Sequence, residues 1–270
     1  MSDKRNTSKK PLKINGFKFF QEHLNLLRHE INNPEQSKPL SSSAIAMYIG
    51  IISECSQSGL LDLGTSIASI SRKLDIAPQT GHDGLKECIE RDLILTRTYN
   101  GKVQYEVGGY DDYNRSREES MGKTKGVSYF LVPSQVITSG VISKLVKAKS
   151  KHGLLLMLEL SNSFHRDLNI WGKDQNERRM DYFKDTLNER SATRVRKILN
   201  ILSPIFTFKP INPQERKPRN LSERVRKAVT QLWIKKFDVR ISPACLIERK
   251  EMETDITQAL KETEIQLKYM

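Results

Sequence analysis

Apolar residues recur at helical spacing along the first quarter of the chain. Phe20, Leu24 and Leu27 share one helical face, which predicts a helix from Phe17 to Ile31 that the following Asn-Asn-Pro sequence ends. A second helix is predicted from Ala44 to Ile52, because its apolar residues are spaced for burial and the three serines before it offer an N-cap.

Two shorter helices and a β-hairpin follow these. The first short helix has its apolar face over residues 67–74, and the second begins at Pro78, a residue suited to the first helical turn. Asn100-Gly101 then separates two β-rich runs, and this pair predicts a tight hairpin because both turn positions need positive φ. We therefore predict the order helix, helix, turn, helix and hairpin for residues 44–107.

The second half of the chain repeats this pattern. A strand at residues 127–133 and a helix carrying Ile142, Leu145 and Val146 come first, and a strongly apolar helix follows around residues 154–164. When the first pattern is displaced by 113 residues, it matches the second without a gap, and apolar positions fall on apolar positions. The matched pairs are Ile67 with Met180, Ile70 with Phe183, Leu74 with Leu187, Thr80 with Thr193, Leu85 with Ile198, Ile89 with Leu202, Leu93 with Phe206 and Leu95 with Phe208.

The chain is strongly basic, with 45 Lys and Arg against 32 Asp and Glu and a formal net charge of +13. Such a charge favours nucleic acid as the partner, because neutralising phosphates releases counterions. Residues 41–110 have a net charge of −2, whereas residues 111–200 have +6 and residues 201–250 have +8. A membrane partner is not expected, since no run approaches the roughly 18 apolar residues of a spanning helix and no apolar signal core follows the basic N-terminus. We therefore expect a cytoplasmic protein.

The two predicted third helices differ in charge at their outward positions. The outward residues are Gly81, Asp83 and Gly84 in the first helix, and Arg194, Arg196 and Lys197, with Arg190 just before, in the second. Duplex DNA carries one negative charge per roughly 1.7 Å of its axis, and arginine can donate two hydrogen bonds to guanine. The second helix therefore suits a DNA groove, whereas the first, with an aspartate and two helix-weakening glycines, suits it poorly. A solvated charged face is the alternative interpretation of the three cations.

The remaining candidate chemistry does not predict an enzyme, a metal site or a cofactor. The five histidines form neither a His-x-His pair nor a His-x-x-Arg motif, and no paired carboxylates share one recognisable element. Cys55, Cys88 and Cys245 are too widely spaced for a metal or disulfide pattern, and Cys88 fits a reduced packing thiol. Trp171 and Trp233 are expected to anchor the core.

The sequence of residues 67–107 resembles the winged helix-turn-helix superfamily, in which the third helix recognises DNA and the hairpin forms the wing. Two such units in a basic chain of this length resemble the replication initiators of bacterial plasmids and some phages, over roughly residues 41–240. The resemblance rests on architecture and on the uneven charge. It implies that the second unit binds repeated sites on double-stranded DNA most strongly. It also implies that the first unit supports a homodimer and weaker contacts, and that host replication proteins are further partners.

We therefore predict a mainly α fold with small β wings (α+β), formed by two tandem winged helix-turn-helix domains. The predicted parts are a disordered basic tail at 1–13, a first domain at 14–110, a linker at 111–126, a second domain at 127–245 and a C-terminal helix at 246–270. Two rivals to the initiator stay open: a dimeric winged-helix transcriptional regulator, and a partition or nucleoid-associated DNA-binding protein.

The resemblance also assigns roles to individual residues. The major-groove role falls to Thr193, Arg194, Arg196 and Lys197, with Arg190 beside them. The DNA-backbone role falls to Arg216, Lys217 and Arg219 in the loop after the second wing strand. Secondary contacts are expected from Gln79, Thr80 and His82, and from the first-wing residues Arg97 and Lys102.

Overall fold

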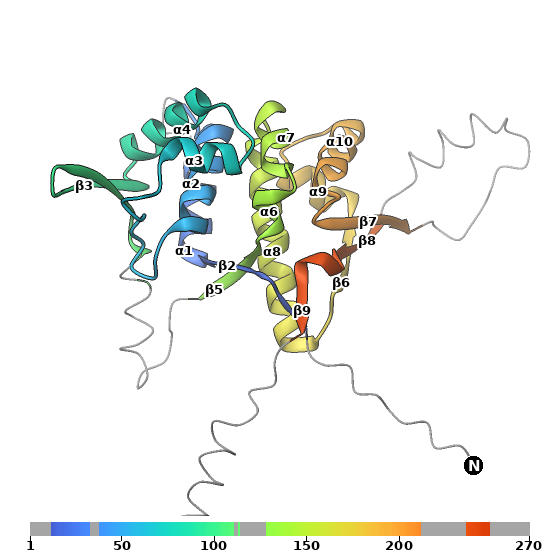
Figure 1. The fold of residues 1–270 in the computed structure, drawn as a ribbon. Coiled ribbons are helices and arrows are strands. Elements are labelled where there is room, and N and C mark those ends of the chain that lie inside the picture. The colour runs from blue at the N-terminus through green and yellow to red at the C-terminus, as the bar shows by residue number, and fades with distance from the viewer. Residues whose placement is uncertain (1–11, 33–37, 111–112, 114–127, 212–235, 249–270) are drawn as a thin grey trace, which may run out of the picture.

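Each half of the chain places helices around a small antiparallel sheet, so the fold is α+β (Figure 1). The computed structural model describes residues 12–32, 38–110, 113, 128–211 and 236–248. In the first half the elements are β1 (Leu12–Ile14), β2 (Gly16–Phe20), α1 (Gln21–Asn32), α2 (Ser42–Glu54), α3 (Ile67–Lys73), α4 (Pro78–Glu90), β3 (Ile94–Tyr99) and β4 (Lys102–Val107). In the second half they are β5 (Tyr129–Pro133), α6 (Gln135–Thr138), α7 (Val141–Lys147), α8 (Lys151–Trp171), β6 (Gln175–Arg179), α9 (Met180–Thr186), α10 (Ala192–Leu202), β7 (Phe206–Ile211), β8 (Lys236–Ile241), η1 (Pro243–Cys245) and β9 (Leu246–Glu248).

Helix α4 packs closely against α2 and α3 because two of its residues are glycines. A Cβ at Gly84 would lie 2.5 Å from the carbonyl oxygen of Ser43, and a Cβ at Gly81 would lie 2.0 Å from Oγ of Ser71. Both glycines are buried. The prediction that Gly81 and Gly84 face outward is therefore wrong: their lack of a side chain serves helix packing.

The hairpin between β3 and β4 is confirmed. Asn100 and Gly101 have φ values of 50° and 73°, and Tyr99 pairs with Lys102 across the turn. Burial falls along β4 from Val107, which is fully buried, to Val103, which is 56% exposed, because the tip extends away from the core. The hairpin is thus an arm that projects from the first half (Figure 1).

The second half repeats the first in its hydrogen-bonded framework. In the first half Leu60 forms an isolated bridge with Glu106 of β4, and the β3–β4 hairpin lies beside it. In the second half the sheet order is β6-β8-β7, with Gln175 paired to Arg240. An equivalent backbone hydrogen bond lies at the end of each sheet. Val107 N donates to Gly59 O at 2.9 Å in the first half, and Ile241 N donates to Asp174 O at 3.2 Å in the second.

The repeat contains a gap, which corrects the gap-free match. Helices α3 and α9 begin 113 residues apart, but α4 and α10 begin 114 apart. Both intervening turns start with a left-handed residue, Asp75 at φ 54° and Asn188 at φ 47°. Two residues then precede Pro78, whereas three precede Ala192, so the second turn is one residue longer. Thr193 therefore corresponds to Gln79.

Two short sheets join the halves and change three sequence-based expectations. Strand β2 pairs with β5 and β1 pairs with β9, so residues 17–20 form a strand instead of the start of the first helix. Residues 12 and 13 likewise lie in β1 and not in a tail, and residues 246–248 form a strand where a helix was predicted. The rest of the predicted tail, most of the linker and residues 249–270 lie outside the described residues.

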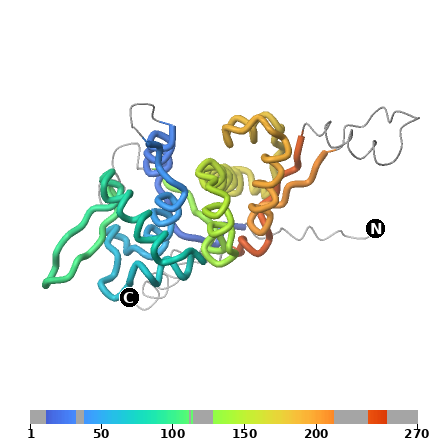
Figure 2. Tube along the Cα trace, turned by 90° about the horizontal axis from the view of Figure 1, so that it is seen from above, coloured from blue at the N-terminus to red at the C-terminus, as the bar shows by residue number. Residues whose placement is uncertain are grey.

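Helices α7 and α8 occupy the middle of the molecule, between α4 and α10 (Figures 1 and 2). Helix α7 packs against α2, α8 and α10, and one hydrophobic core runs through both halves. A Cβ at Gly153 of α8 would lie 2.8 Å from Cδ2 of Leu145 and 3.2 Å from Cγ2 of Ile198, so this glycine lets α7, α8 and α10 meet. Trp171, at the last turn of α8, is 67% exposed and does not anchor the core, and Trp233 lies outside the described residues.

A histidine is buried in the aromatic core of the first half. The ring of His23 lies 5.7 or 5.8 Å from those of Phe20, Tyr48 and Tyr110, and Nε2 lies 3.2 Å from the carbonyl oxygen of Gly108. Nδ1 has no hydrogen-bond partner among the described protein atoms. Desolvation lowers the pKa of His23 from 6.5 to about 4, so the ring is neutral in the folded protein at neutral pH.

Candidate nucleic-acid interface

Helix α10 is amphipathic and presents polar and cationic side chains to solvent. Val195, Leu199 and Leu202 are buried against the second half of the core. The residues exposed on the opposite face are Thr193, Arg194, Lys197 and Asn200, with Arg196 half-buried beside them. Spacings of three and four residues bring these side chains onto one face. Asn200 was missed in the sequence analysis, although its spacing of three residues from Lys197 signals the same face.

The start of α10 is held by its own turn. Ser191 is the N-cap and its hydroxyl accepts from the backbone N–H of Arg194 at 3.4 Å, which satisfies one of the free amides of the first turn. Glu189 accepts from the backbone N–H of Ser191 at 2.9 Å and lies 3.4 Å from Nη1 of Arg194. The Ser191 bond, followed by Arg194, lowers the pKa of Glu189. This exposed ion pair is weak, so an anion that approaches α10 can displace Glu189 from Arg194.

Helix α4, in the corresponding place of the first half, presents a different face. Gln79, His82, Asp83 and Lys86 are exposed, and Thr80 is half-buried. Gln79 donates to Asp83 at 2.8 Å, and Lys86 lies 3.9 Å from the carboxylate of Glu90. The polar groups of this face are therefore partly engaged with one another.

The two hairpins carry the remaining predicted contacts. Arg97 of β3 forms an ion pair with Glu106 across the hairpin, so its charge is partly neutralised, whereas Lys102 is exposed beside the tip. Leu95, Tyr99 and Val103 of the same hairpin are 38%, 57% and 56% exposed. Leu95 and Tyr99 share one face of the hairpin, whereas Val103 lies on the opposite face. In the second half, the predicted backbone contacts Arg216, Lys217 and Arg219 lie outside the described residues.

The predicted residues of α4 and α10 fall into two groups at one end of the molecule. The chain rises through α6 and α7, turns, and descends along α8, so the turn between α7 and α8 lies at the same end as α4 and α10 (Figure 1). Seen from above, α7 separates the α3–α4 pair from the α9–α10 pair (Figure 2). The structure therefore brings Thr193, Arg194, Arg196 and Lys197 together and keeps Gln79, Thr80 and His82 as a second group across α7.

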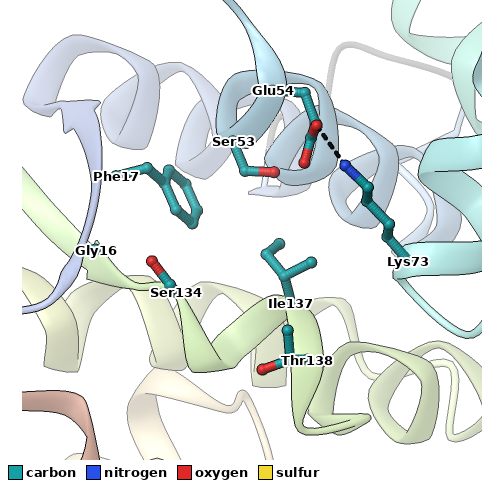
Figure 3. A pocket seen from close by; sticks show the side chains of 8 residues that line it. All are labelled: Gly16, Phe17, Ser53, Glu54, Lys73, Ser134, Ile137 and Thr138. Atoms are coloured by element: carbon teal, nitrogen blue, oxygen red, sulfur yellow. Dashed lines mark hydrogen bonds and ion pairs between the residues drawn. The ribbon is translucent and has the colours of Figure 1, made fainter. Parts of the chain in front are cut away.

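A cavity of about 410 Å³ lies where the two halves meet, away from the exposed face of α10. Phe17 and Ile137 form its apolar walls, and the Glu54–Lys73 ion pair, 2.6 Å between Oε2 and Nζ, lies at its rim (Figure 3). The other residues that line it are Gly16, Ser53, Ser134 and Thr138. Among the described residues, no histidine lines this cavity, and the amine of Lys73 is paired with the carboxylate of Glu54 at its rim.

Across residues 12–32, 38–110, 113, 128–211 and 236–248, no three His, Cys, Asp or Glu side chains gather as a set of metal ligands. Cys88 is buried, donates to the carbonyl oxygen of Ala44 at 3.2 Å and has its pKa raised by desolvation to about 12, as expected of a packing thiol. Within the same described ranges, every helix is too short or too polar to cross a bilayer. Searches of protein-family models, of curated proteins and of solved structures found no match to the chain.

Proposed function

We propose that this chain is a sequence-specific double-stranded-DNA-binding protein with two tandem winged helix-turn-helix units. The first unit comprises α2, α3, α4 and the β3–β4 hairpin, and the second comprises α8, α9, α10 and the β6-β8-β7 sheet. The observation that carries the proposal is the exposed face of α10, where Arg194 and Lys197 stand beside Thr193 and Asn200 on a capped helix that follows a tight turn. Arginine pairs with guanine and asparagine with adenine in the major groove, while threonine and lysine suit phosphates.

The shared end of the molecule supports the binding of one duplex by both units. Helices α4 and α10 both lie at this end, on either side of α7 (Figures 1 and 2). The α10 face carries only cationic and neutral side chains, whereas the α4 face carries Asp83 and Glu90 as well as Lys86. We therefore assign most of the affinity and specificity to α10, and a secondary contact to Gln79 and His82 of α4.

Within this class, we favour a replication initiator that binds repeated sites at a plasmid or phage origin in the cytoplasm. Two unlike helix-turn-helix units in one chain recognise an asymmetric sequence, which suits sites repeated in one direction. A homodimer through the first unit is part of the proposal, and the exposed apolar side chains of its hairpin support it, with Leu95 and Tyr99 on one face and Val103 on the other. Host replication proteins would then be further partners, and binding, not catalysis, would be the chain's own activity.

The decisive experiment is selection of bound sequences from a random duplex library at one fixed salt concentration. We expect an asymmetric motif; a single palindrome would instead favour a dimeric regulator, and no motif would favour a nucleoid-associated protein. Given the motif, the R194A/R196A/K197A variant should lose at least about 100-fold in specific affinity, because each base or phosphate contact contributes about 1 to 3 kcal/mol. The R97A/K102A variant, which changes the first hairpin, should lose less, and equal losses would contradict the assignment to α10.

The initiator role needs a separate test in cells. A plasmid whose only origin is a fragment with several copies of the selected motif should replicate when the wild-type chain is supplied, and should fail with the R194A/R196A/K197A variant. Specific binding without replication from any such fragment would retain the DNA-binding function and exclude the initiator role.

A further inference from the structure

Three lysines crowd the turn between α7 and α8. Lys144 and Lys147 lie in the last turn of α7, and Lys149 lies in the turn itself with a left-handed φ of 51°. All three are exposed. Neither the winged helices nor their hairpins account for this cluster, because α7 precedes the second unit.

The position of this lysine turn is fixed by contacts with both halves. Helix α7 packs against α2 of the first unit and α10 of the second. Nζ of Lys147 lies 3.9 Å from Oδ2 of Asp75, the left-handed residue in the turn between α3 and α4. Lys144 and Lys149 form no ion pair with any described residue. The packing of α7 thus places the lysine turn between the two proposed helix-turn-helix units, and Lys147 is the one of the three with an ionic partner among the described residues.

The three exposed lysines concentrate positive charge at one turn, and such a concentration attracts anions. Helix C-termini favour nearby cations by about 0.3 to 1 kcal/mol, which accounts for Lys144 and Lys147 in part. Lys149 is the left-handed residue that ends α7, and its backbone N–H donates to the carbonyl oxygen of Val146 at 2.9 Å. Its side chain is exposed and takes no part in this cap. A polyanion that passes over α7 would satisfy all three charges at once, and duplex DNA between two groove-bound helices does so, because its phosphates face the protein there.

We infer that Lys144, Lys147 and Lys149 bind the phosphates of the same duplex in the segment between the parts contacted by α4 and α10. The inference rests on the proposed function and adds a third, sequence-independent contact to it. The lysines position the duplex across α7 and leave the choice of sequence to the flanking helices. The salt bridge to Asp75 opens as phosphate replaces the carboxylate.

The test compares two variants that each remove three positive charges. K144Q/K147Q/K149Q removes the lysine turn. K13Q/R166Q/K173Q is the matched control, because Lys13, Arg166 and Lys173 are exposed on β1 and around the end of α8, away from the end that carries α4 and α10 (Figure 1). Affinity for the selected motif and for a scrambled duplex is measured from 50 to 300 mM salt, and phosphate-ethylation interference maps the contacted backbone.

The lysine-turn variant should bind both duplexes more weakly, by roughly tenfold at low salt, with an unchanged ratio between them. The slope of log K against log salt should become shallower by about 0.9 for each phosphate that the variant no longer neutralises. The ethylation signal should vanish from the central segment only, while the control variant keeps the wild-type slope and pattern. Equal slopes for the two variants, or an unchanged central signal, would overturn the inference while wild-type specific binding retains the proposed function. Absence of specific binding by the wild type would overturn both.

Discussion

Helices α4 and α10 occupy corresponding places in the two halves, yet they pack and face solvent differently. Helix α4 packs against α2 and α3 at Gly81 and Gly84, where a side chain would collide with the neighbouring helix. Helix α10 has Val195 and Ile198 at the corresponding positions, as the one-residue-longer turn before it dictates. Helix α4 therefore lies close to the helices that it packs against, whereas the branched side chains of Val195 and Ile198 keep α10 further from its neighbours.

The solvent-exposed faces of the two helices also differ, in how far their polar groups bond to one another. On α4, Gln79 bonds to Asp83 and Lys86 is close to Glu90, so its polar groups serve the helix itself. On α10, Arg194 has the half-buried Glu189 as its ionic partner among the described residues, and Lys197 forms no ion pair with any of them. The two halves thus share an order of elements but differ in the charge of one exposed helical face, and the difference lies in a few residues on α4 and α10.

The largest effect is expected when the exposed faces of α4 and α10 are exchanged. We expect the T193Q/R194T/R196H/K197D variant, which gives α10 the face of α4, to lose at least about 100-fold in specific DNA affinity, because it removes three cations and adds a carboxylate. The reverse exchange, Q79T/T80R/H82R/D83K, should raise affinity for any duplex. Both are measured by titration of labelled duplex at fixed salt.

A protein with both exchanges has the net charge of the wild type and is the control. It should regain affinity for DNA without regaining the original sequence preference, because the cations then stand on the other unit. Full recovery of specificity would mean that total charge, and not its place on α10, determines recognition.

The elements that depend on local chemistry could be predicted from the sequence. Pro78 at the start of α4 and Asn100-Gly101 in the hairpin act through the backbone of one or two residues, so no distant contact is needed. The pairing of β1 with β9 could not be predicted. Strands of three residues contain too little periodicity for a signal, and their partners lie at opposite ends of the chain.

The exposure of Arg194 and Lys197 on α10 agrees with the sequence prediction, but the register between α4 and α10 was predicted wrongly. The apolar residues at the end of α10 are Ile198, Leu199, Ile201 and Leu202, so a shift of one position still places apolar residues on apolar residues. The extra residue in the preceding turn was therefore invisible to the pattern. Trp171 shows a similar limit, because its apolar character predicts burial while the last turn of α8 extends past the core.

The buried His23 makes the first half acid-sensitive, whereas the aromatic cluster of the second half, around Phe183, contains only Phe and Tyr rings. Desolvation, followed by Lys151, also lowers the pKa of His152 in the second half, so His152 adds to the acid sensitivity of the chain. The folded pKa of His23, about 4, lies below the ordinary 6.5, so the unfolded chain binds the proton more readily. The stabilisation is complete above pH 6.5 and is lost as pH falls from 6.5 to 4. We expect a loss of about 3 kcal/mol in unfolding free energy across that window, measured by urea denaturation.

The H23F variant should remove the larger part of this pH dependence, because phenylalanine cannot take up the proton and the pocket is lined by aromatic rings, and the remainder should come from His152. H29Q, which changes a histidine with a 63% exposed side chain on the same helix, is the control and should keep the wild-type profile. A wild-type slope in H23F would show that other groups cause the acid sensitivity.

Close packing of α4 predicts a smaller effect for one added methyl group. In G84A, the new Cβ would meet the backbone oxygen of Ser43 at 2.5 Å, so α4 must move away from α2. Overpacking of this kind costs about 2 kcal/mol. G64A is the control, since its Cβ would meet only Oδ2 of Asp62, at 3.9 Å. Equal midpoints of urea unfolding for the two variants would mean that α4 and α2 tolerate a wider spacing.

The smallest expected change in stability comes from the N-caps, in which α4 and α10 differ. Ser191 caps α10 with its hydroxyl, whereas Ala77 at the start of α4 has no side-chain bond to offer, although its extended backbone is that of a capping residue. S191A should therefore lower the unfolding free energy by about 1 kcal/mol, and A77S should raise it by about 0.5 kcal/mol. S191T, which keeps the hydroxyl, should stay close to the wild type. If S191A unfolds at the wild-type urea concentration, Glu189 and not the serine hydroxyl holds the turn that presents Arg194, and E189Q should then be the destabilised variant.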